Sequence, residues 1–283
     1  MTFSVNESLN EPLKDKIKVQ VNLFYLAVSF FTRLPVPKTM IYSESLLNKA
    51  NRFFSLVGIV IGLLLVFGYV IFSAFLPTNI AILLTMILSL FLTGAFHEDG
   101  LADMADGIGG AFSIEKRLTI MKDSRIGTYG AVTLVMALLL KFTLLLEMAK
   151  NDSNYLLLAI VLAEALSRAV AGSLISGMPY VSDIEQSKSK PLAQAQSSLE
   201  LIILLLIGSA PLLFYSIDII FSLLIVLIIF RALFKRWLMN KIGGFTGDCL
   251  GAAQQISQLL IYLTLVFFAN ENIYPVTVQG GLG

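Results

Sequence analysis

Charged residues are scarce in this chain, and cysteine and histidine are almost absent. Only 14% of the 283 residues are charged, against about 25% in a typical soluble domain. A single cysteine excludes an intrachain disulfide and a thiolate-rich metal site. The net charge of +1 gives no electrostatic basis for binding nucleic acid. Because 57% of the residues are hydrophobic, the composition indicates a membrane protein.

Apolar runs about as long as a bilayer is thick recur along the chain. They predict an all-α fold, a polytopic membrane helix bundle with about seven transmembrane helices. The predicted spans are 53–76, 79–96, 129–149, 154–176, 200–216, 218–234 and 250–269. A further segment, 20–34, is too short to span comfortably and predicts a re-entrant or interfacial N-terminal helix. One membrane domain should therefore cover residues 20–270, between a polar N-terminal tail (1–19) and a C-terminal tail (271–283).

The connections between the predicted spans alternate in charge. Those after the first, third and fifth spans are short and nearly free of basic residues, whereas the other connections and the N-terminal tail carry most of the lysines and arginines. By the positive-inside rule, the basic segments are cytoplasmic. The polar, glycine-rich motifs all fall on this side, so we expect a site that faces the cytoplasm.

The densest group of charges follows the second predicted span, in the stretch FHEDGLADMADG (residues 96–107). On a helix that continues from this span, Asp99, Asp103 and Asp106 lie within about 60° of one another on one face. Hard oxygen ligands at this density suit Mg²⁺, which also takes water and substrate phosphates as ligands. The alternative is a solvated loop at a helix end that binds no metal.

Two neighbours of these aspartates could take part in the chemistry. Glu98 points about 100° away from Asp99 on a helix and could support the metal or act as a general base. His97, the only histidine in the chain, could act as a base, orient a carboxylate, or merely mark the membrane interface.

A second motif, MKDSRIGTYGA (residues 121–131), precedes the third predicted span. Lys122 and Arg125 could neutralise a phosphate, the arginine in bidentate fashion. Thr128 is a plausible N-cap, and the free amides of that helix start would attract the same phosphate. Asp123 could complete the metal site or pair with Arg125. The alternative is a basic cluster that only sets the topology.

A third motif, GGFTGDCLGA (residues 243–252), immediately precedes the last predicted span. Its glycines surround Thr246 and Asp248, which suggests a helix-start turn that holds an anion on its amides or gives Asp248 to a metal. A glycine-rich turn packed between helices is the alternative. Cys249 is expected to be a small packing residue.

Three charged residues fall within the predicted spans. Glu164 and Arg168 are four residues apart and should pair across one helix turn, facing the bundle interior. Lys141 should find a partner or line a polar cavity.

Without any family knowledge, these motifs indicate a carboxylate-bound divalent metal that faces cationic phosphate ligands at the membrane surface. Metal ions that bridge a diphosphate stabilise the charge on a leaving nucleotide, so phosphoryl or phosphodiester transfer is the natural chemistry.

Four motifs together resemble those of the cobalamin synthase family, the adenosylcobinamide-GDP ribazoletransferases. They are FFTRLPVP near the start, FHEDGLADMADGIGG, MKDSRIGTYGA and GGFTGDCLGA, in this order. The resemblance extends over nearly the whole chain, and four motifs in order are far more specific than any one of them.

The resemblance implies a multi-pass enzyme of the cell inner membrane in the last steps of cobalamin biosynthesis. It implies that the enzyme joins adenosylcobinamide-GDP to α-ribazole or its 5′-phosphate, releases GMP and uses Mg²⁺. With the reasoning above, it gives the candidate metal ligands Glu98, Asp99, Asp103 and Asp106. The candidate cofactor- and substrate-binding residues are Arg33, Lys122, Asp123, Arg125, Gly127, Thr246, Gly247 and Asp248. The candidate catalytic residues are His97, Glu98, Lys122 and Arg125.

Two other functions fit parts of the pattern. A CDP-alcohol phosphotransferase also sets aspartates on membrane helix ends, but after Asp99 and Gly100 this chain lacks the arginine and the downstream aspartate pair of that motif. A cation transporter would favour acids within the spans of two repeated halves, whereas these acids cluster at one edge. The expected partners are the two small-molecule substrates and membrane lipid, with no nucleic acid; a homo-oligomer is left open.

Overall fold

Helices form most of the chain. The structure, a computed structural model, describes residues 13–182 and 195–270, and within these ranges it contains helices and no strand. In chain order the elements are α1 Leu13–Phe31, α2 Glu44–Ala50, the 3₁₀ helix η2 Asn51–Phe53, α3 Phe54–Phe75, α4 Thr78–Thr93, α5 Phe96–Gly110, α6 Ile114–Met121, α7 Thr128–Asn151, α8 Ser153–Ser173, α9 Ser198–Ser209, the 3₁₀ helix η3 Ala210–Phe214, α10 Ile217–Ile242 and α11 Gly247–Asn270. The all-α prediction is confirmed. Of the predicted tails, residues 1–12 and 271–283 lie outside the described residues.

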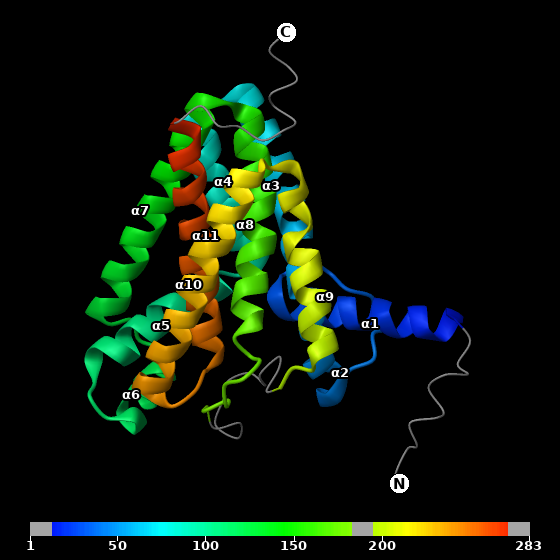
Figure 1. Cartoon of the computed structure of the whole chain (residues 1–283), viewed down its shortest axis with the longest axis vertical. Helices are drawn as coiled ribbons and strands as arrows, with labels where there is room; N and C mark the ends of the chain where they lie inside the picture. Colours follow the sequence, from blue (N-terminus) through cyan, green and yellow to red (C-terminus); the bar gives the residue numbers. More distant parts are fainter. Residues whose placement is uncertain (1–12, 183–194, 271–283) are drawn as a thin grey trace.

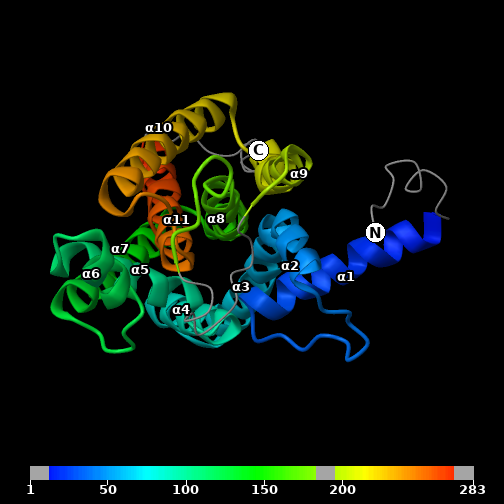
Figure 2. The ribbon, with the colours of Figure 1, turned by 90° about the horizontal axis from the view of Figure 1, so that it is seen from below.

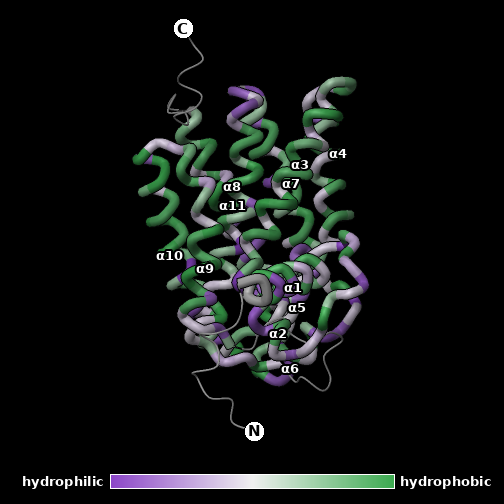
Figure 3. Tube along the Cα trace, turned by 90° about the vertical axis from the view of Figure 1, so that its right-hand side faces the viewer, coloured by the Kyte–Doolittle hydropathy of each residue, from purple (hydrophilic) through white to green (hydrophobic). Residues whose placement is uncertain are grey.

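The helices α3, α4, α7, α8, α9, α10 and α11 stand side by side along the long axis of the molecule (Figure 1), and each coincides with a predicted span. Five helices of the described chain are long and apolar enough to cross a membrane, or six if α4 and α5 form one broken span. The remaining apolar upright helix, Ser198–Phe214, is shorter. The protein is therefore a multi-pass membrane protein. Figure 3 shows hydrophobic residues along the upright helices.

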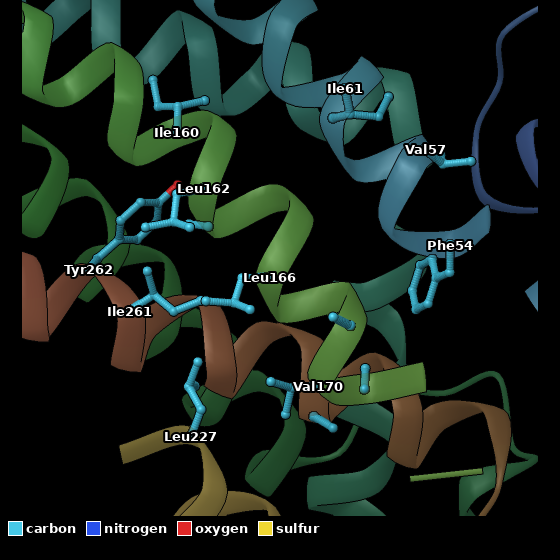
Figure 4. Packing of buried hydrophobic residues seen from close by; sticks show 14 of the residues in the cluster. Phe54, Val57, Ile61, Ile160, Leu162, Leu166, Val170, Leu227, Ile261 and Tyr262 are labelled. Carbon is cyan, nitrogen blue, oxygen red and sulfur yellow. The ribbon is translucent and has the colours of Figure 1, made fainter. Parts of the chain in front are cut away.

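Helix α8 lies at the centre of the bundle, and 83% of its most apolar 18-residue stretch is buried inside the protein. It packs against α3, α9 and α11, and Figure 4 shows side chains of α3, α8 and α11 that form this core. A Cβ on Gly58 of α3 would lie 2.9 Å from Cδ of Arg168 on α8. Small residues at helix contacts let the backbones approach closely in a membrane bundle.

The short helices α2 and α6, together with α1 and α5, gather at one end of the bundle, which we call the motif end (Figures 1 and 2). Helix α1 lies across the long axis rather than along it. Its apolar part, Ile17–Phe31, is shorter than the helices long enough to cross a membrane. Of the two predicted alternatives, re-entrant or interfacial, this orientation fits the interfacial one. The helix begins at Leu13, inside the predicted tail 1–19, and ends at Phe31 rather than 34.

The predicted continuation of the second span into the acidic motif is wrong. Helix α4 ends at Thr93, α5 begins at Phe96, and the chain bends by 86° between them. Gly94 (φ 67°) and Ala95 (φ 56°) both adopt left-handed backbone conformations, which break the helix. The acidic motif therefore lies across the motif end on a helix of its own.

Candidate active site at the motif end

Helix α5 carries the acidic motif, and its aspartates share one helical face as predicted. Asp99 is exposed, Asp103 is half-buried and Asp106 is buried. Because the helix rises about 1.5 Å per residue, Asp99 and Asp106 are about 10 Å apart along its axis. One face of α5 therefore runs from an open end at Asp99 to a closed end at Asp106.

The third motif packs directly against this helix. A Cβ on Gly100 would lie 3.0 Å from Cα of Asp248 and 3.3 Å from Cα of Gly251, at the start of α11. The two helices can approach this closely because neither glycine carries a side chain. The structure thus brings Asp248 next to the turn of α5 that holds Asp99 and Asp103.

Thr246 shapes the start of α11. Its hydroxyl accepts a hydrogen bond from the backbone N–H of Cys249 at 3.3 Å, as an N-cap residue does. The predicted helix-start turn is therefore present, with Thr246 buried and Gly247 exposed beside the half-buried Asp248. Cys249 is buried in the hydrophobic core, as expected for a packing residue.

The second motif meets the closed end of α5. The N-cap of α7 is Gly127, not Thr128, because α7 begins at Thr128. Asp106 accepts hydrogen bonds from the backbone N–H groups of Gly127 (2.6 Å) and Gly130 (2.8 Å). The prediction that free amides of this helix start attract a phosphate is therefore wrong for these two amides, because a carboxylate of the same chain occupies them.

The two basic side chains of this motif differ in exposure: Arg125 is exposed, whereas Lys122 is half-buried. The side chain of Arg125 is 86% exposed, and its guanidinium forms an ion pair with Asp123 at 2.6 Å. The predicted pairing of these two residues is confirmed. The hydrogen bond from Arg125 to Asp123 raises the pKa of the guanidinium further above its usual value. Lys122 caps the C-terminus of α6. Both cations follow α6 and precede α7, so they lie beside the closed end of α5.

The first motif reaches the start of α5. The backbone N–H of Arg33 donates to the carbonyl of Leu92 at 2.7 Å, and a Cβ on Gly94 would lie 3.2 Å from Cζ of Arg33. The guanidinium of Arg33 therefore packs on the bend between α4 and α5. All four motifs converge around α5.

His97 and Glu98 are buried on the inner side of α5. The ring of His97 stacks with those of Phe31 and Phe54, at centroid distances of 6.2 and 5.8 Å. Burial, together with the positive charges of Arg168 and Lys141, lowers the pKa of His97 well below its usual value. The imidazole is therefore neutral.

Glutamines of α11 form a hydrogen-bonded chain that reaches Glu98, and they were not among the residues predicted from the sequence. Gln255 donates to Glu98 Oε1 at 2.9 Å and to Gln254 Oε1 at 2.9 Å, and Gln254 donates to Ser167 of α8 at 3.0 Å. Oε2 of Glu98 has no partner among the described residues. Polar residues within an otherwise apolar span were the available signal.

The charged residues within the spans pair as predicted. Glu164 and Arg168 form a buried ion pair, and Lys141 donates to Gln258 at 2.9 Å. Gln258 in turn donates to Glu164 at 2.6 Å. This network joins α7, α8 and α11 inside the bundle.

Comparison with known proteins gives the family of this chain. The family model for cobalamin-5-phosphate synthase matches residues 23–266. Similar proteins named adenosylcobinamide-GDP ribazoletransferase occur in Vibrio parahaemolyticus (56% identical, covering 89% of this chain and 94% of the relative) and in Vibrio cholerae (52% identical, covering 91% and 98%). The chain belongs to the cobalamin-5-phosphate synthase family.

As a member of the cobalamin-5-phosphate synthase family, the chain is an enzyme of cobalamin biosynthesis. A relative from Vibrio vulnificus, named adenosylcobinamide-GDP ribazoletransferase, is 57% identical over 87% of this chain and 96% of its own length. No solved structure matches the chain. The four motifs that resemble those of this family lie together around α5 in the structure.

The resemblance seen in the sequence predicts Mg²⁺, and the carboxylates of α5 are the candidate ligands. Among the described residues, no group of three or more His, Cys, Asp and Glu side chains is placed to hold a metal ion. Mg²⁺, however, is usually held by one or two carboxylates together with water and substrate phosphates. Asp99 and Asp103, one helix turn apart towards the open end of α5, fit such a site. Asp106 fits less well, because both its oxygens accept backbone hydrogen bonds.

Proposed function

We propose that this enzyme joins adenosylcobinamide-GDP to α-ribazole or α-ribazole 5′-phosphate, releasing GMP, in a Mg²⁺-dependent reaction. The names of relatives that are 52–57% identical support the donor and the ribazole acceptor. The convergence of the four motifs around α5 supports a single reaction centre at the motif end.

The bond changes follow from these substrates. A hydroxyl oxygen of the ribazole attacks the phosphorus on the cobinamide side of the diphosphate. The bond between this phosphorus and the oxygen bridging to GMP breaks, GMP leaves with the bonding electron pair, and the hydroxyl proton passes to a base. The family model is named for a 5-phosphate product. A phosphate that persists in the product is not the attacking group, which supports the hydroxyl.

In this proposal, different residues of the site bind the metal, the phosphate and the rest of the substrate. Asp99 and Asp103 would hold Mg²⁺, which when bound would neutralise charge on the diphosphate. Arg125 is exposed and can reach a phosphate, and Lys122 precedes it in the same loop. The start of α11, with Gly247 and Asp248, borders α5 at Gly100, near its open end, and would contact the substrate there.

For the base we propose Glu98 rather than His97. The carboxylate of Glu98 is fixed on one oxygen by Gln255, and its other oxygen has no partner among the described residues. Nε2 of His97 is likewise buried and has no partner among the described residues. The rings of Phe31, Phe54 and Phe96 surround the imidazole, however, and this favours a packing role.

The positive-inside rule supports a motif end that faces the cytoplasm, across the cell inner membrane. The exposed cations Lys116 and Arg125 both lie at this end. Its amphipathic helix α1 lies across the bundle axis (Figure 1), as expected of a helix in contact with lipid at the membrane surface.

Convergence of the acidic and basic motifs on α5 is the observation that carries the proposal. The test is GMP release by the purified protein in proteoliposomes given adenosylcobinamide-GDP and α-ribazole, with and without Mg²⁺. We expect GMP only when both substrates and Mg²⁺ are present. Release of CMP from a CDP-alcohol, or metal-ion transport without nucleotide release, would contradict the proposal and favour a phospholipid synthase or a transporter.

A further inference from the structure

The carboxylate of Asp106 joins two helices that carry different motifs. Asp106 belongs to α5 and is buried, at 7% exposure. Its Oδ2 accepts from the N–H of Gly127 and its Oδ1 accepts from the N–H of Gly130, at the start of α7. A carboxylate at a helix start satisfies backbone N–H groups that have no partner within the helix, and it is attracted by the positive end of the helix dipole.

The two glycines make this contact possible. A Cβ on Gly127 would lie 2.9 Å from Cγ of Asp106, and a Cβ on Gly130 would lie equally close to the same atom. On Gly130, it would also lie 2.8 Å from the carbonyl oxygen of Ala102 on α5. Real Cβ atoms essentially never come so near to another heavy atom. A side chain at Gly130 would therefore push α7 away from the backbone of α5, and one at Gly127 would displace the carboxylate of Asp106.

This contact sets where the basic motif lies relative to the acidic one. Lys122 and Arg125 lie between α6 and α7, and the chain after them is anchored through Gly127 to Asp106. Asp99 and Asp103 lie on the same helix as Asp106. A fixed α5–α7 contact therefore holds the groups proposed for the phosphate at a set position relative to those proposed for the metal.

We infer that Asp106 is a positioning residue rather than a metal ligand. It clamps the start of α7 to α5 through Gly127 and Gly130, so that Lys122 and Arg125 face the diphosphate held at Asp99 and Asp103. The inference rests on the proposed function only for the role of the positioned cations. The clamp itself can be tested without substrate.

A cross-link between the two helices reports the clamp directly. A Cβ on Gly109 of α5 would lie 2.7 Å from Cγ of Tyr129 on α7, so cysteines at these positions are near the Cβ separation that a disulfide needs. The native Cys249 is buried and should not interfere. We expect Gly109→Cys/Tyr129→Cys to oxidise readily, and Asp106→Ala in this background to slow oxidation by roughly tenfold.

The metal is tested separately with Mn²⁺, which accepts the same oxygen ligands as Mg²⁺ and gives an electron paramagnetic resonance signal. Asp106→Asn keeps one carbonyl acceptor in nearly the same volume and should bind Mn²⁺ within about threefold of the parent protein. The matched control Asp103→Asn, which removes a proposed ligand, should weaken Mn²⁺ binding by at least about 10- to 100-fold while cross-linking normally.

Activity completes the test. Gly130→Ala, which leaves every carboxylate in place, should lower GMP release about as far as Asp106→Ala, and the double variant should be no worse than either. Unchanged cross-linking in Asp106→Ala would overturn the clamp, and so would a loss of Mn²⁺ binding in Asp106→Asn as large as in Asp103→Asn. Absence of GMP release from the parent protein would overturn the proposed function and leave the cross-linking and Mn²⁺ results to decide the clamp.

Discussion

Neighbouring carboxylates on α5 meet different surroundings. Asp99 is exposed, while Glu98 beside it is buried and accepts a hydrogen bond from Gln255. Asp106 is enclosed by the backbone of α7. A carboxylate that accepts two backbone N–H bonds offers little to a metal, whereas an exposed one can exchange water for a metal and a phosphate. Burial thus separates residues that the sequence places in one motif.

Asp99→Asn and Asp103→Asn should each abolish GMP release while the protein stays folded. Asparagine keeps the volume of the side chain but removes the negative charge that Mg²⁺ needs. We expect each loss to exceed the about 10- to 100-fold loss that follows removal of a residue supporting a metal ligand. Full activity in either variant would contradict the metal site. Asp218→Asn is the matched control, because Asp218 is exposed in the first turn of α10, at the opposite end of the bundle, and it should leave the rate unchanged.

The buried ion pair gives a second prediction at this scale. Arg168→Met leaves Glu164 buried with its charge less compensated, which should lower the free energy of unfolding by about 3 kcal/mol. Thermal unfolding in detergent measures the loss. The double variant Glu164→Leu/Arg168→Met removes both charges and should recover most of the stability. A double variant as unstable as Arg168→Met would show that the pair does not act as a unit.

At the scale of elements, the bend between α4 and α5 decides where the acidic motif lies. Two successive left-handed residues, Gly94 and Ala95, turn the chain by 86°. The guanidinium of Arg33 packs against this bend. The bend therefore links the FFTRLPVP motif to α5, the helix that carries the acidic motif. A substitution at Gly94 should therefore alter the position of the acidic residues as well as the local backbone.

Gly94→Ala should lower both stability and GMP release. An L side chain in the left-handed region costs about 1–2 kcal/mol, and the new Cβ would also displace Arg33. Gly177→Ala is the matched control, because Gly177 has φ 82° and its Cβ would meet only the mobile end of Lys235. Both variants should unfold at a lower temperature, but only Gly94→Ala should lose activity per folded molecule. Equal activity losses would rule out a specific role for the bend.

For the whole molecule, the arrangement of helices places every motif at one end of the bundle (Figures 1 and 2). Helices α5 and α6 and the start of α7 follow one another in the chain, and the start of α11, from a distant part of the chain, meets them there. The opposite end carries the tight connections between α3 and α4 and between α7 and α8. The molecule therefore offers the proposed reaction to one compartment only.

Cysteine labelling in intact cells tests this orientation. Lys116→Cys, on the exposed side of α6, should react with a membrane-impermeant maleimide only after the cells are opened. Asn79→Cys, which is exposed at the start of α4, should react from outside. The buried Cys249 leaves the parent protein as an unlabelled control. The reverse pattern would place the motif end outside and contradict the cytoplasmic site.

The sequence determined the fold class because apolar runs of bilayer length have few structures open to them. Each predicted span coincides with an upright helix, and the pairing of Glu164 with Arg168 followed from their spacing alone. The four motifs also indicated the family, because residue types at fixed spacing identify a chemistry even when their positions in space are unknown.

Only the tertiary structure decided which motif residues face a ligand and which hold the helices together. The N-cap of α7 is Gly127 rather than the predicted Thr128. Asp106 accepts hydrogen bonds from two amides that were expected to bind a phosphate. The bend at Gly94 rests on left-handed residues that no periodic pattern marks. The contacts of Asp106 join different helices through residues 21 and 24 positions apart, and a sequence pattern reports only what lies within one helix. The acidic stretch therefore serves two purposes: Asp99 and Asp103 for the proposed metal, and Asp106 for the clamp on α7.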